Sequence, residues 1–187
     1  MNIHMSNRLL SKDLSKDIKY NLKKDFPKEG VLFVDFMPTF MDMDLMTRLS
    51  YNISDVLEAL NIDYVIAPES RGFILGTLVA LRLRANLIPV RKHGKIPEEF
   101  VSCSHTYDTE YSTATLDLPK CDLEGKNCIF IDDVYALGGT YNACKFLVES
   151  SGGKMLGGAC LYDVGINKND EIITYLNRQD IDTHNIY

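Results

Sequence analysis

Short runs of apolar residues alternate along this chain with segments whose apolar residues recur at helical spacing. The runs are continuous, which is typical of strands buried on both faces of a parallel sheet. One helical segment ends near Arg84, and another begins near Thr140. This order predicts an α/β fold with a central parallel sheet and helices on both faces. The predicted strands cover residues 64–67, 87–90, 128–131 and 155–162.

The first sixty residues contain two segments with helical periodicity. Apolar residues at every fourth position over 10–22 predict an amphipathic helix, and a loop containing Pro and Gly is expected over 26–39. A second helix follows, because Asp42 and Asp44 stand where a helix N-terminus favours negative charge and apolar residues continue at helical spacing to Leu60. The apolar positions of the first helix are Leu10, Leu14, Ile18 and Leu22.

The composition fits one globular domain over residues 1–187. The chain is 45% hydrophobic and 25% charged, which supplies a core and argues against disorder. Its 20 Lys and Arg against 26 Asp and Glu leave a formal charge of −6, which excludes a non-specific nucleic-acid binder. No leader or membrane-spanning run stands out, and the five cysteines form no CxxC pair. We therefore expect a cytoplasmic protein, without a membrane or nucleic-acid partner, whose thiols are free and mostly buried.

The strongest chemical signal follows the predicted strand at 128–131. Two adjacent acids, Asp132 and Asp133, precede a turn of small residues that leads into a helix. Glycines let backbone N–H groups converge at such a turn, and the helix N-terminus adds positive potential, so the turn suits a phosphate monoester. The acids would repel that phosphate, and we expect them to accept hydrogen bonds from vicinal sugar hydroxyls. The turn consists of Ala136, Leu137, Gly138, Gly139 and Thr140.

This segment resembles the phosphoribosyl-diphosphate signature of the type I phosphoribosyltransferases. Four further stretches are similar to one branch of that family, the adenine phosphoribosyltransferases, so the resemblance spans about residues 26–165. The stretches are FPKEGVLFVD at 26–35, PESRGFILG at 68–76, PVRKHGKIP at 89–97 and YDTEY at 107–111. The resemblance implies a type I phosphoribosyltransferase fold, with an N-terminal helix and hood at 1–40 and a flexible lid loop at 91–115.

The resemblance also implies a reaction. A 5-phosphoribosyl group would pass from 5-phosphoribosyl 1-diphosphate (PRPP) to adenine, giving AMP and diphosphate in purine salvage. Mg²⁺, held mainly by PRPP oxygens and water, is the implied cofactor, and a homodimer is the expected assembly. Two alternatives stay open: another purine (hypoxanthine, guanine or xanthine) in the same site, or a non-catalytic regulator that binds PRPP.

Roles for the PRPP-binding residues follow from the same resemblance. Asp132 and Asp133 would hold the ribose, and the turn at 136–140 its 5′-phosphate. In the family the diphosphate binds a loop that often contains a cis peptide, which here would be Glu69–Ser70. The implied diphosphate ligands are Ser70, Arg71, Arg91, Lys92 and Lys95.

Base binding and catalysis are assigned in the same way. Val31, Leu32 and Phe33 would read and stack on the purine, and Val164 would cover its other face. The implied catalytic residues are Arg71, at the leaving diphosphate, and Glu110, near the ring nitrogens as proton acceptor or donor. Tyr111 would pack the lid or touch the reacting sugar.

Two positions depart from the family pattern. Leu137 stands where the family usually has Thr, so one hydroxyl donor to the 5′-phosphate is missing. Losing one donor to a charged group costs about 1.5–3 kcal/mol, so weaker PRPP binding is expected. Val34 stands where an Arg is common, which bears on base preference.

Overall fold

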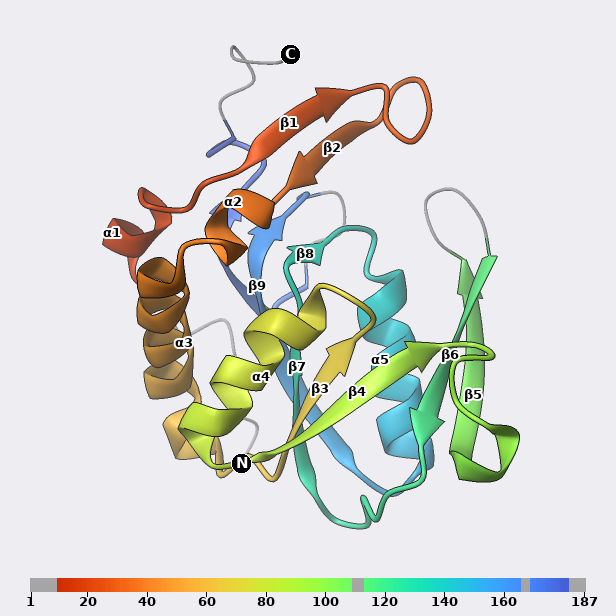
Figure 1. Ribbon diagram of the computed structural model, residues 1–187. Helices are drawn as coiled ribbons and strands as arrows, with labels where there is room; N and C mark the ends of the chain where they lie inside the picture. Colours follow the sequence, from red (N-terminus) through yellow and green to blue (C-terminus); the bar gives the residue numbers. More distant parts are fainter. Residues whose placement is uncertain (1–9, 109–112, 166–168, 182–187) are drawn as a thin grey trace.

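One mixed sheet runs through the middle of the molecule (Figure 1). The computed structural model describes residues 10–108, 113–165 and 169–181, and eight strands of this described part form the sheet. In space they follow the order β10, β9, β7, β3, β4, β6, β5, and β8 pairs with the end of β9. Their bounds are β3 Tyr64–Pro68, β4 Asn86–Lys92, β5 Val101–Asp108, β6 Thr113–Pro119, β7 Asn127–Ile131, β8 Val134–Tyr135, β9 Lys154–Asp163 and β10 Ile172–Asn177.

The strands from β10 to β4 are parallel, and β6 and β5 extend the sheet in antiparallel pairing. The four strands predicted from apolar runs are confirmed as β3, β4, β7 and β9. The two central strands, β3 and β7, are short and apolar because they are buried on both faces, whereas in β4 only Ile88 and Val90 are buried. The predicted α/β class with a mostly parallel sheet is confirmed.

Helices cover both faces of the parallel strands. On one face α3 and α4 pack against Val65 and Ile129, and on the other α5 packs against Ile66 and Phe130 (Figure 1). Successive residues of a strand point to opposite faces, so each continuous apolar run contributes to both cores. The helices are α3 Met43–Leu57, α4 Gly72–Leu83 and α5 Gly139–Ser150.

The predicted start of α3 is confirmed. Asp42 is the N-cap, and its Oδ1 accepts a hydrogen bond from the N–H of Leu45 at 3.0 Å. Asp44 lies in the first turn, where it complements the helix dipole. A short 3₁₀ helix, Glu58–Leu60, continues the segment to the predicted end.

The helix expected over 10–22 is wrong. Only α1 is helical there, and Leu22 lies in β1, which pairs antiparallel with β2 inside the segment expected as a loop. Leu10, Ile18 and Leu22 are nevertheless buried. Residues four apart lie on one face of a helix, and because four is an even number they also lie on one face of a strand. Pairing with β2 therefore decides that Leu22 lies in a strand. The N-terminal elements are α1 Lys12–Ser15, β1 Asn21–Lys24, β2 Leu32–Asp35 and α2 Met37–Phe40.

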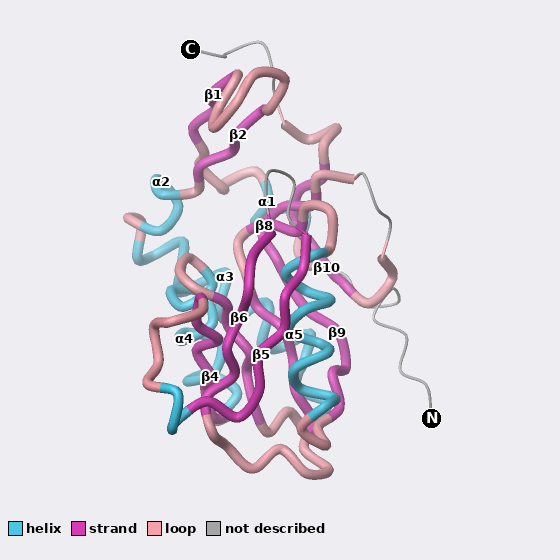
Figure 2. Tube along the Cα trace, turned by 90° about the vertical axis from the view of Figure 1, so that its right-hand side faces the viewer, coloured by secondary structure: helices cyan, strands magenta, loops and turns pink. Residues whose placement is uncertain are grey.

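The segment expected as a flexible lid loop, residues 91–115, contains mostly regular structure where it is described. A 3₁₀ helix spans Glu98–Phe100, and β5 and β6 then form a long antiparallel hairpin (Figure 2). Side chains of β5 alternate between more and less exposed positions, as expected for a strand with one covered face. Mobility of this segment stays a prediction.

The carboxyl ends of β3, β4, β7 and β9 meet at one edge of the sheet, and the hairpin of β1 and β2 lies above that edge (Figure 1). Ligands of such sheets bind at this edge. All five cysteines are free, and three of them are buried, which confirms the expected thiols. Among the described residues, no helix is both long enough and apolar enough to span a membrane.

Candidate active site

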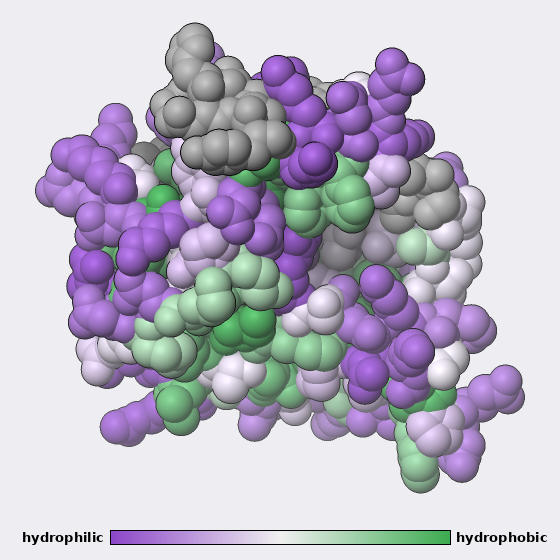
Figure 3. Space-filling view, turned by 45° about the horizontal axis from the view of Figure 1, so that its top comes forward, coloured by the Kyte–Doolittle hydropathy of each residue, from purple (hydrophilic) through white to green (hydrophobic). Residues whose placement is uncertain are grey.

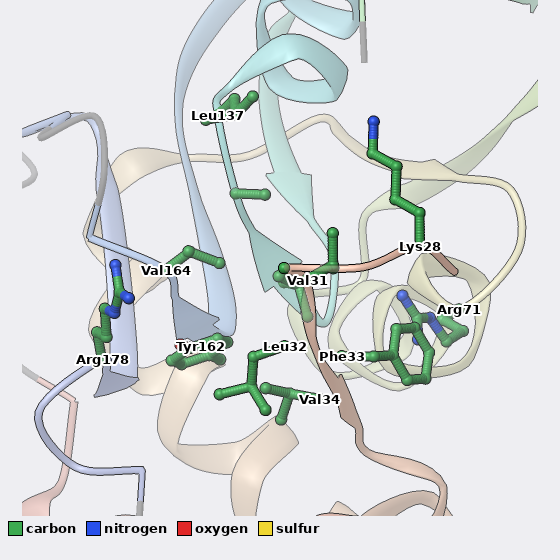
Figure 4. Close-up of a pocket in the computed structure, with 13 residues that line it drawn as sticks. Lys28, Val31, Leu32, Phe33, Val34, Arg71, Leu137, Tyr162, Val164 and Arg178 are labelled. Carbon is green, nitrogen blue, oxygen red and sulfur yellow. The ribbon is translucent and has the colours of Figure 1, made fainter. Parts of the chain in front are cut away.

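A cavity of about 570 Å³ lies between the N-terminal hairpin and the carboxyl edge of the sheet (Figure 4). Four residues expected at the base, Val31, Leu32, Phe33 and Val164, all line it. Val34 lines it as well, so the position where the family often has Arg is part of the wall. The remaining lining residues include Lys28, Arg71, Ala136, Leu137, Tyr162 and Arg178.

The two ends of this cavity differ in chemistry. At one end the guanidinium of Arg71 lies over the ring of Phe33, with Cζ 5.6 Å from the ring centroid. Phe26 packs edge-on against the same ring at 5.1 Å. Val164 and Arg178 lie at the opposite end (Figure 4). Apolar walls with a few polar groups suit a flat heterocycle.

The backbone of Val31 is already engaged in the hairpin. Its N–H donates to the carbonyl of Lys28 at 3.3 Å, and its carbonyl accepts from the N–H of Phe26 at 3.4 Å. Both distances lie beyond the usual range for N–H···O bonds. A base read by this backbone would therefore replace two long hydrogen bonds.

A second cavity of about 190 Å³ lies at the N-terminus of α5 and includes all five residues of the predicted phosphate turn. Gly138 has φ +85°, a conformation that glycine adopts without a steric penalty. The hydroxyl of Tyr107 lies 3.2 Å from Thr140 Oγ1 across this turn. Ala136 and Leu137 line both cavities, so the two adjoin.

The acids Asp132 and Asp133 lie beside the cavities but are not among the residues that line them. The side chain of Asp133 is 3% exposed, and its Oδ2 lies 2.9 Å from Arg71 Nε without a well-formed hydrogen bond among the described residues. Asp132 is half-buried, and its Oδ1 accepts from the N–H of Asp133 at 2.9 Å. Burial raises the pKa of Asp132 well above its ordinary value, and the neighbouring Asp133 charge adds to the rise. Burial also raises the pKa of Asp133, although Arg71 opposes the rise.

The loop after β3 brings Arg71 to this point. The Glu69–Ser70 peptide is cis, as the resemblance implied. A Cβ at Gly72 would lie 2.7 Å from Pro68 Cδ and 2.9 Å from the carbonyl oxygen of Ile131. Glycine therefore lets α4 begin close against β3 and β7, which places Arg71 next to the acids.

The expected diphosphate cations gather beside the same loop. Arg91 Nε lies 3.1 Å from Glu69 Oε2, and the N–H of Lys92 donates to that oxygen at 3.0 Å. The N–H of Lys92 is the main reason that the pKa of Glu69 lies below its ordinary value, and Arg91 lowers it further against the effect of burial. The N–H of Lys95 donates to the carbonyl of Lys92 at 3.2 Å. Pairing of β3 with β4 thus unites residues that are about twenty positions apart.

Several lining residues escaped sequence reasoning. Tyr162 ends a predicted strand, so its place at the carboxyl edge could have been inferred. Arg178 follows β10, which the run Ile-Ile-Thr-Tyr-Leu at 172–176 could have predicted. Lys28 and Tyr107 lie within stretches that carry the family resemblance, but no role was assigned to them. Glu110 and Tyr111 lie outside the described residues.

Known proteins similar to this chain agree on one family. Residues 42–186 match the phosphoribosyl transferase domain. The adenine phosphoribosyltransferase of Corynebacterium glutamicum is 38% identical over 143 residues, which cover 75% of this chain and 76% of that protein. The one from Alkaliphilus metalliredigens is 34% identical over 161 residues, covering 86% and 94%.

Solved structures agree as well. Adenine phosphoribosyltransferase from Thermoanaerobacter pseudethanolicus superposes with a TM-score of 0.80 at 32% identity, covering 89% of this chain and 99% of that one. The Saccharomyces cerevisiae protein, solved with adenine and D-2,5-dideoxy-2,5-imino-altritol 1,6-bisphosphate, also gives 0.80, at 31% identity over 89% and 100%. This chain therefore belongs to the type I phosphoribosyltransferase family, among the adenine phosphoribosyltransferases.

Proposed function

We propose that this protein transfers the 5-phosphoribosyl group of PRPP to adenine, giving AMP and diphosphate in purine salvage. The observation that carries this proposal is the pair of adjoining cavities, one with apolar walls for a base and one at a helix N-terminus for a phosphate. A nucleoside monophosphate has these two parts, joined by a ribose. The acids Asp132 and Asp133 stand beside that junction.

Each group of residues has a part in holding PRPP. The turn at 136–140 binds the 5′-phosphate through its backbone N–H groups and Thr140. Asp132 and Asp133 accept hydrogen bonds from the ribose hydroxyls. Ser70, Arg71, Arg91, Lys92 and Lys95 bind the diphosphate.

Diphosphate binding is expected to replace two ion pairs within the protein by ion pairs with the ligand. Arg71 is paired with Asp133, and Arg91 with Glu69. A diphosphate offers each guanidinium more negative charge than one carboxylate does. Arg71 would then leave Asp133 Oδ2 available to a ribose hydroxyl.

At the anomeric carbon the bond to diphosphate breaks as the bond to the purine nitrogen forms. Such displacements develop oxocarbenium character. The protein acts by holding both reactants in line and by neutralising the leaving diphosphate, with Arg71 as one of the cations that do so. Glu110 accepts the proton that the purine loses, and Tyr111 and the β5–β6 hairpin cover the reacting sugar.

Mg²⁺ fits the oxygen-rich chemistry of this site. The described residues contain no group of three or more His, Cys, Asp or Glu side chains that could enclose a metal. The ion would therefore take most of its ligands from PRPP and water, a mode that Mg²⁺ favours. When bound, it would neutralise charge on the diphosphate.

Turnover of labelled adenine with PRPP, with and without Mg²⁺, tests the proposed function. AMP and diphosphate are expected in equal amounts, and chelation of Mg²⁺ is expected to abolish the reaction. Hypoxanthine, guanine and xanthine serve as competing bases in the same assay. Turnover of an oxopurine but not of adenine would contradict the proposed substrate, and tight PRPP binding without any turnover would indicate a regulator.

Replacement of Leu137 by Thr is expected to lower the KM for PRPP about tenfold, because one added hydroxyl donor to a phosphate contributes about 1.5 kcal/mol. Leu137 lines the phosphate cavity, so the new hydroxyl would face the ligand. Steady-state kinetics with varied PRPP measures the effect. Leu137→Val, which has the branched shape of Thr without its hydroxyl, is the control. Equal KM values for the two variants would contradict a missing donor.

We further propose a cytoplasmic homodimer. Met43 and Tyr51 of α3 and Ile74 and Leu81 of α4 expose large apolar side chains, and Leu81 is 77% exposed. Figure 3 shows hydrophobic side chains grouped in the middle of one side of the molecule. Exposed apolar patches often mark interfaces.

Sedimentation equilibrium is expected to give twice the 21.2 kDa of one chain, and Leu81→Lys is expected to weaken the assembly. A monomer at micromolar concentration would contradict this proposal.

A further inference from the structure

A buried aspartate outside both cavities collects three hydrogen-bond donors. Asp117 of β6 is 1% exposed. Its Oδ1 accepts from Ser104 Oγ at 2.6 Å, and its two oxygens lie 3.0 and 3.2 Å from His93 Nδ1. Its Oδ2 also accepts from the N–H of Gly94 at 3.2 Å. These residues, Asp117, His93, Gly94 and Ser104, form what we call the Asp117 cluster.

The Asp117 cluster lies where three strands meet. β6 lies between β4 and β5 (Figure 2), and Asp117 pairs with Arg91 of β4 on one side and with Ser104 of β5 on the other. The N–H of His93 donates to the carbonyl of Thr115 at 3.0 Å, which extends the contact between β4 and β6. Gly94, at φ +77°, then turns the chain. The turn at 93–95 is thus attached to β6 through both side chains and backbone.

A carboxylate in such a position must be satisfied, because burying an unpaired charge is costly. Burial alone would raise the pKa of Asp117, but the hydrogen bonds from Ser104, His93 and Gly94 outweigh it and hold the pKa below its ordinary value. Asp117 is therefore ionised at neutral pH. Its negative charge holds the three donor groups of Ser104, His93 and Gly94 in one arrangement around the carboxylate.

The turn held by Asp117 adjoins the cations of the proposed diphosphate site. Arg91 and Lys92 come directly before it, and Lys95 closes it with a backbone hydrogen bond to Lys92 at 3.2 Å. Glu69 holds Arg91 and Lys92 from the side of β3. The cation cluster therefore has a second anchor on the lid side, and that anchor is Asp117.

We propose that Asp117 is a positioning residue for PRPP, fixing the turn at 93–95 so that Arg91, Lys92 and Lys95 face the diphosphate together. This inference rests on the proposed function. Asp117 itself does not touch the substrate. It restricts the conformations of these three cations before PRPP arrives, so that less conformational entropy is lost on binding.

The geometry also gives PRPP binding a dependence on pH. His93 faces Asp117 of β6, and the charge of Glu98 in the 3₁₀ helix acts on it as well; Lys92, at the end of β4, and Lys95, in the turn, are its charged neighbours along the chain. The hydrogen bond to Asp117 is the main cause that raises the pKa of His93, and the charges of Asp117 and Glu98 add to it. Because the folded pKa is raised, the contribution of the charged pair is complete below the ordinary value of 6.5 and is lost as pH rises through the folded pKa.

Steady-state kinetics on three variants test the proposal. Asp117→Asn, which keeps the shape but not the charge, is expected to raise the KM for PRPP about tenfold, as for a lost charge-assisted hydrogen bond. The KM for adenine is expected to stay within about twofold, because no residue of the Asp117 cluster lines the proposed base cavity. His93→Gln is expected to raise the KM for PRPP about threefold at pH 6, a typical loss for an exposed ion pair, and to match wild type at pH 9. Comparing wild type with His93→Gln cancels the titration of PRPP itself.

Asp122→Asn, on an exposed loop after β6, is the matched control and is expected to behave as wild type. Equal rises in both KM values for Asp117→Asn, or no rise, would overturn the proposal. If Asp117→Asn does not fold, Ser104→Ala and His93→Gln decide instead, and unchanged KM values for PRPP in both would overturn it. Absence of turnover in wild type, measured in the same assay, would refute the proposed function rather than the role of Asp117.

Discussion

The double substitution Asp132→Asn/Asp133→Asn is expected to lower kcat/KM for phosphoribosyl transfer about a hundredfold or more. Each carboxylate that accepts a hydrogen bond from a ribose hydroxyl contributes about 1.5–3 kcal/mol, and the amides keep only part of this. The measurement is steady-state turnover of labelled adenine with varied PRPP. Asp55→Asn, an exposed acid on α3, is the control and should retain full activity. Full activity in the double variant would remove the ribose-binding role of both acids.

The same double variant should not lose stability at neutral pH. Burial raises the folded-state pKa of both acids above their unfolded value, so the folded protein binds protons more readily than the unfolded chain. Wild-type stability therefore falls as pH rises from the ordinary Asp value through the folded pKa. Amides do not titrate, so this slope should be smaller in the double variant. Denaturant midpoints measured across that pH range check the sign, and an increased slope would contradict it.

Gly138→Ala is expected to have the second large effect, on both PRPP binding and stability. Gly138 has φ +85°, and an added Cβ would lie 2.6 Å from the hydroxyl of Tyr135. The strain of the left-handed conformation costs about 1–2 kcal/mol, and overpacking adds about 1–3 kcal/mol. Tyr135 is buried against Tyr141 and cannot move away freely. The phosphate turn must shift instead, so the KM for PRPP should rise at least about tenfold, as expected when a charge-assisted hydrogen bond is lost.

Gly125→Ala separates backbone strain from contact. Gly125 has φ +66°, but an added Cβ there would meet nothing within 4 Å, and it precedes β7, whereas the turn at 136–140 follows that strand. It should lose about 1–2 kcal/mol of stability without any change in KM. Denaturant unfolding and PRPP kinetics on both variants make the comparison. A wild-type KM in Gly138→Ala would show that the turn does not hold the 5′-phosphate.

Much of the site could be predicted from the chain because its chemistry is local. The turn at 136–140 is contiguous in sequence, and its glycines and the following helix predict an anion site without help from distant residues. The acids directly before it end a buried strand, so their place at the carboxyl edge follows from the strand itself. The apolar runs of β3, β7 and β9 are equally local, since burial on both faces leaves an unbroken apolar pattern.

Strand pairing, in contrast, decides features that no local pattern predicts. The spacing of the apolar residues from Leu10 to Leu22 fits both a helix and a strand. Only pairing with β2 selects the hairpin that covers the proposed base cavity. The lid segment forms β5 and β6 because the two strands pair with each other, and a single apolar run does not predict such pairing.

The sequence by itself determined the α/β class, the proposed phosphate turn, the acid pair beside it and the cations of the proposed diphosphate site, because each depends on neighbouring residues. Only the tertiary structure decided how these groups are connected. It paired Arg71 with Asp133 and Arg91 with Glu69, brought Arg178 to the base cavity, and buried Asp117 under the turn at 93–95. Such contacts join residues that are far apart along the chain, so they exist only once strand order and register have fixed the distances between them.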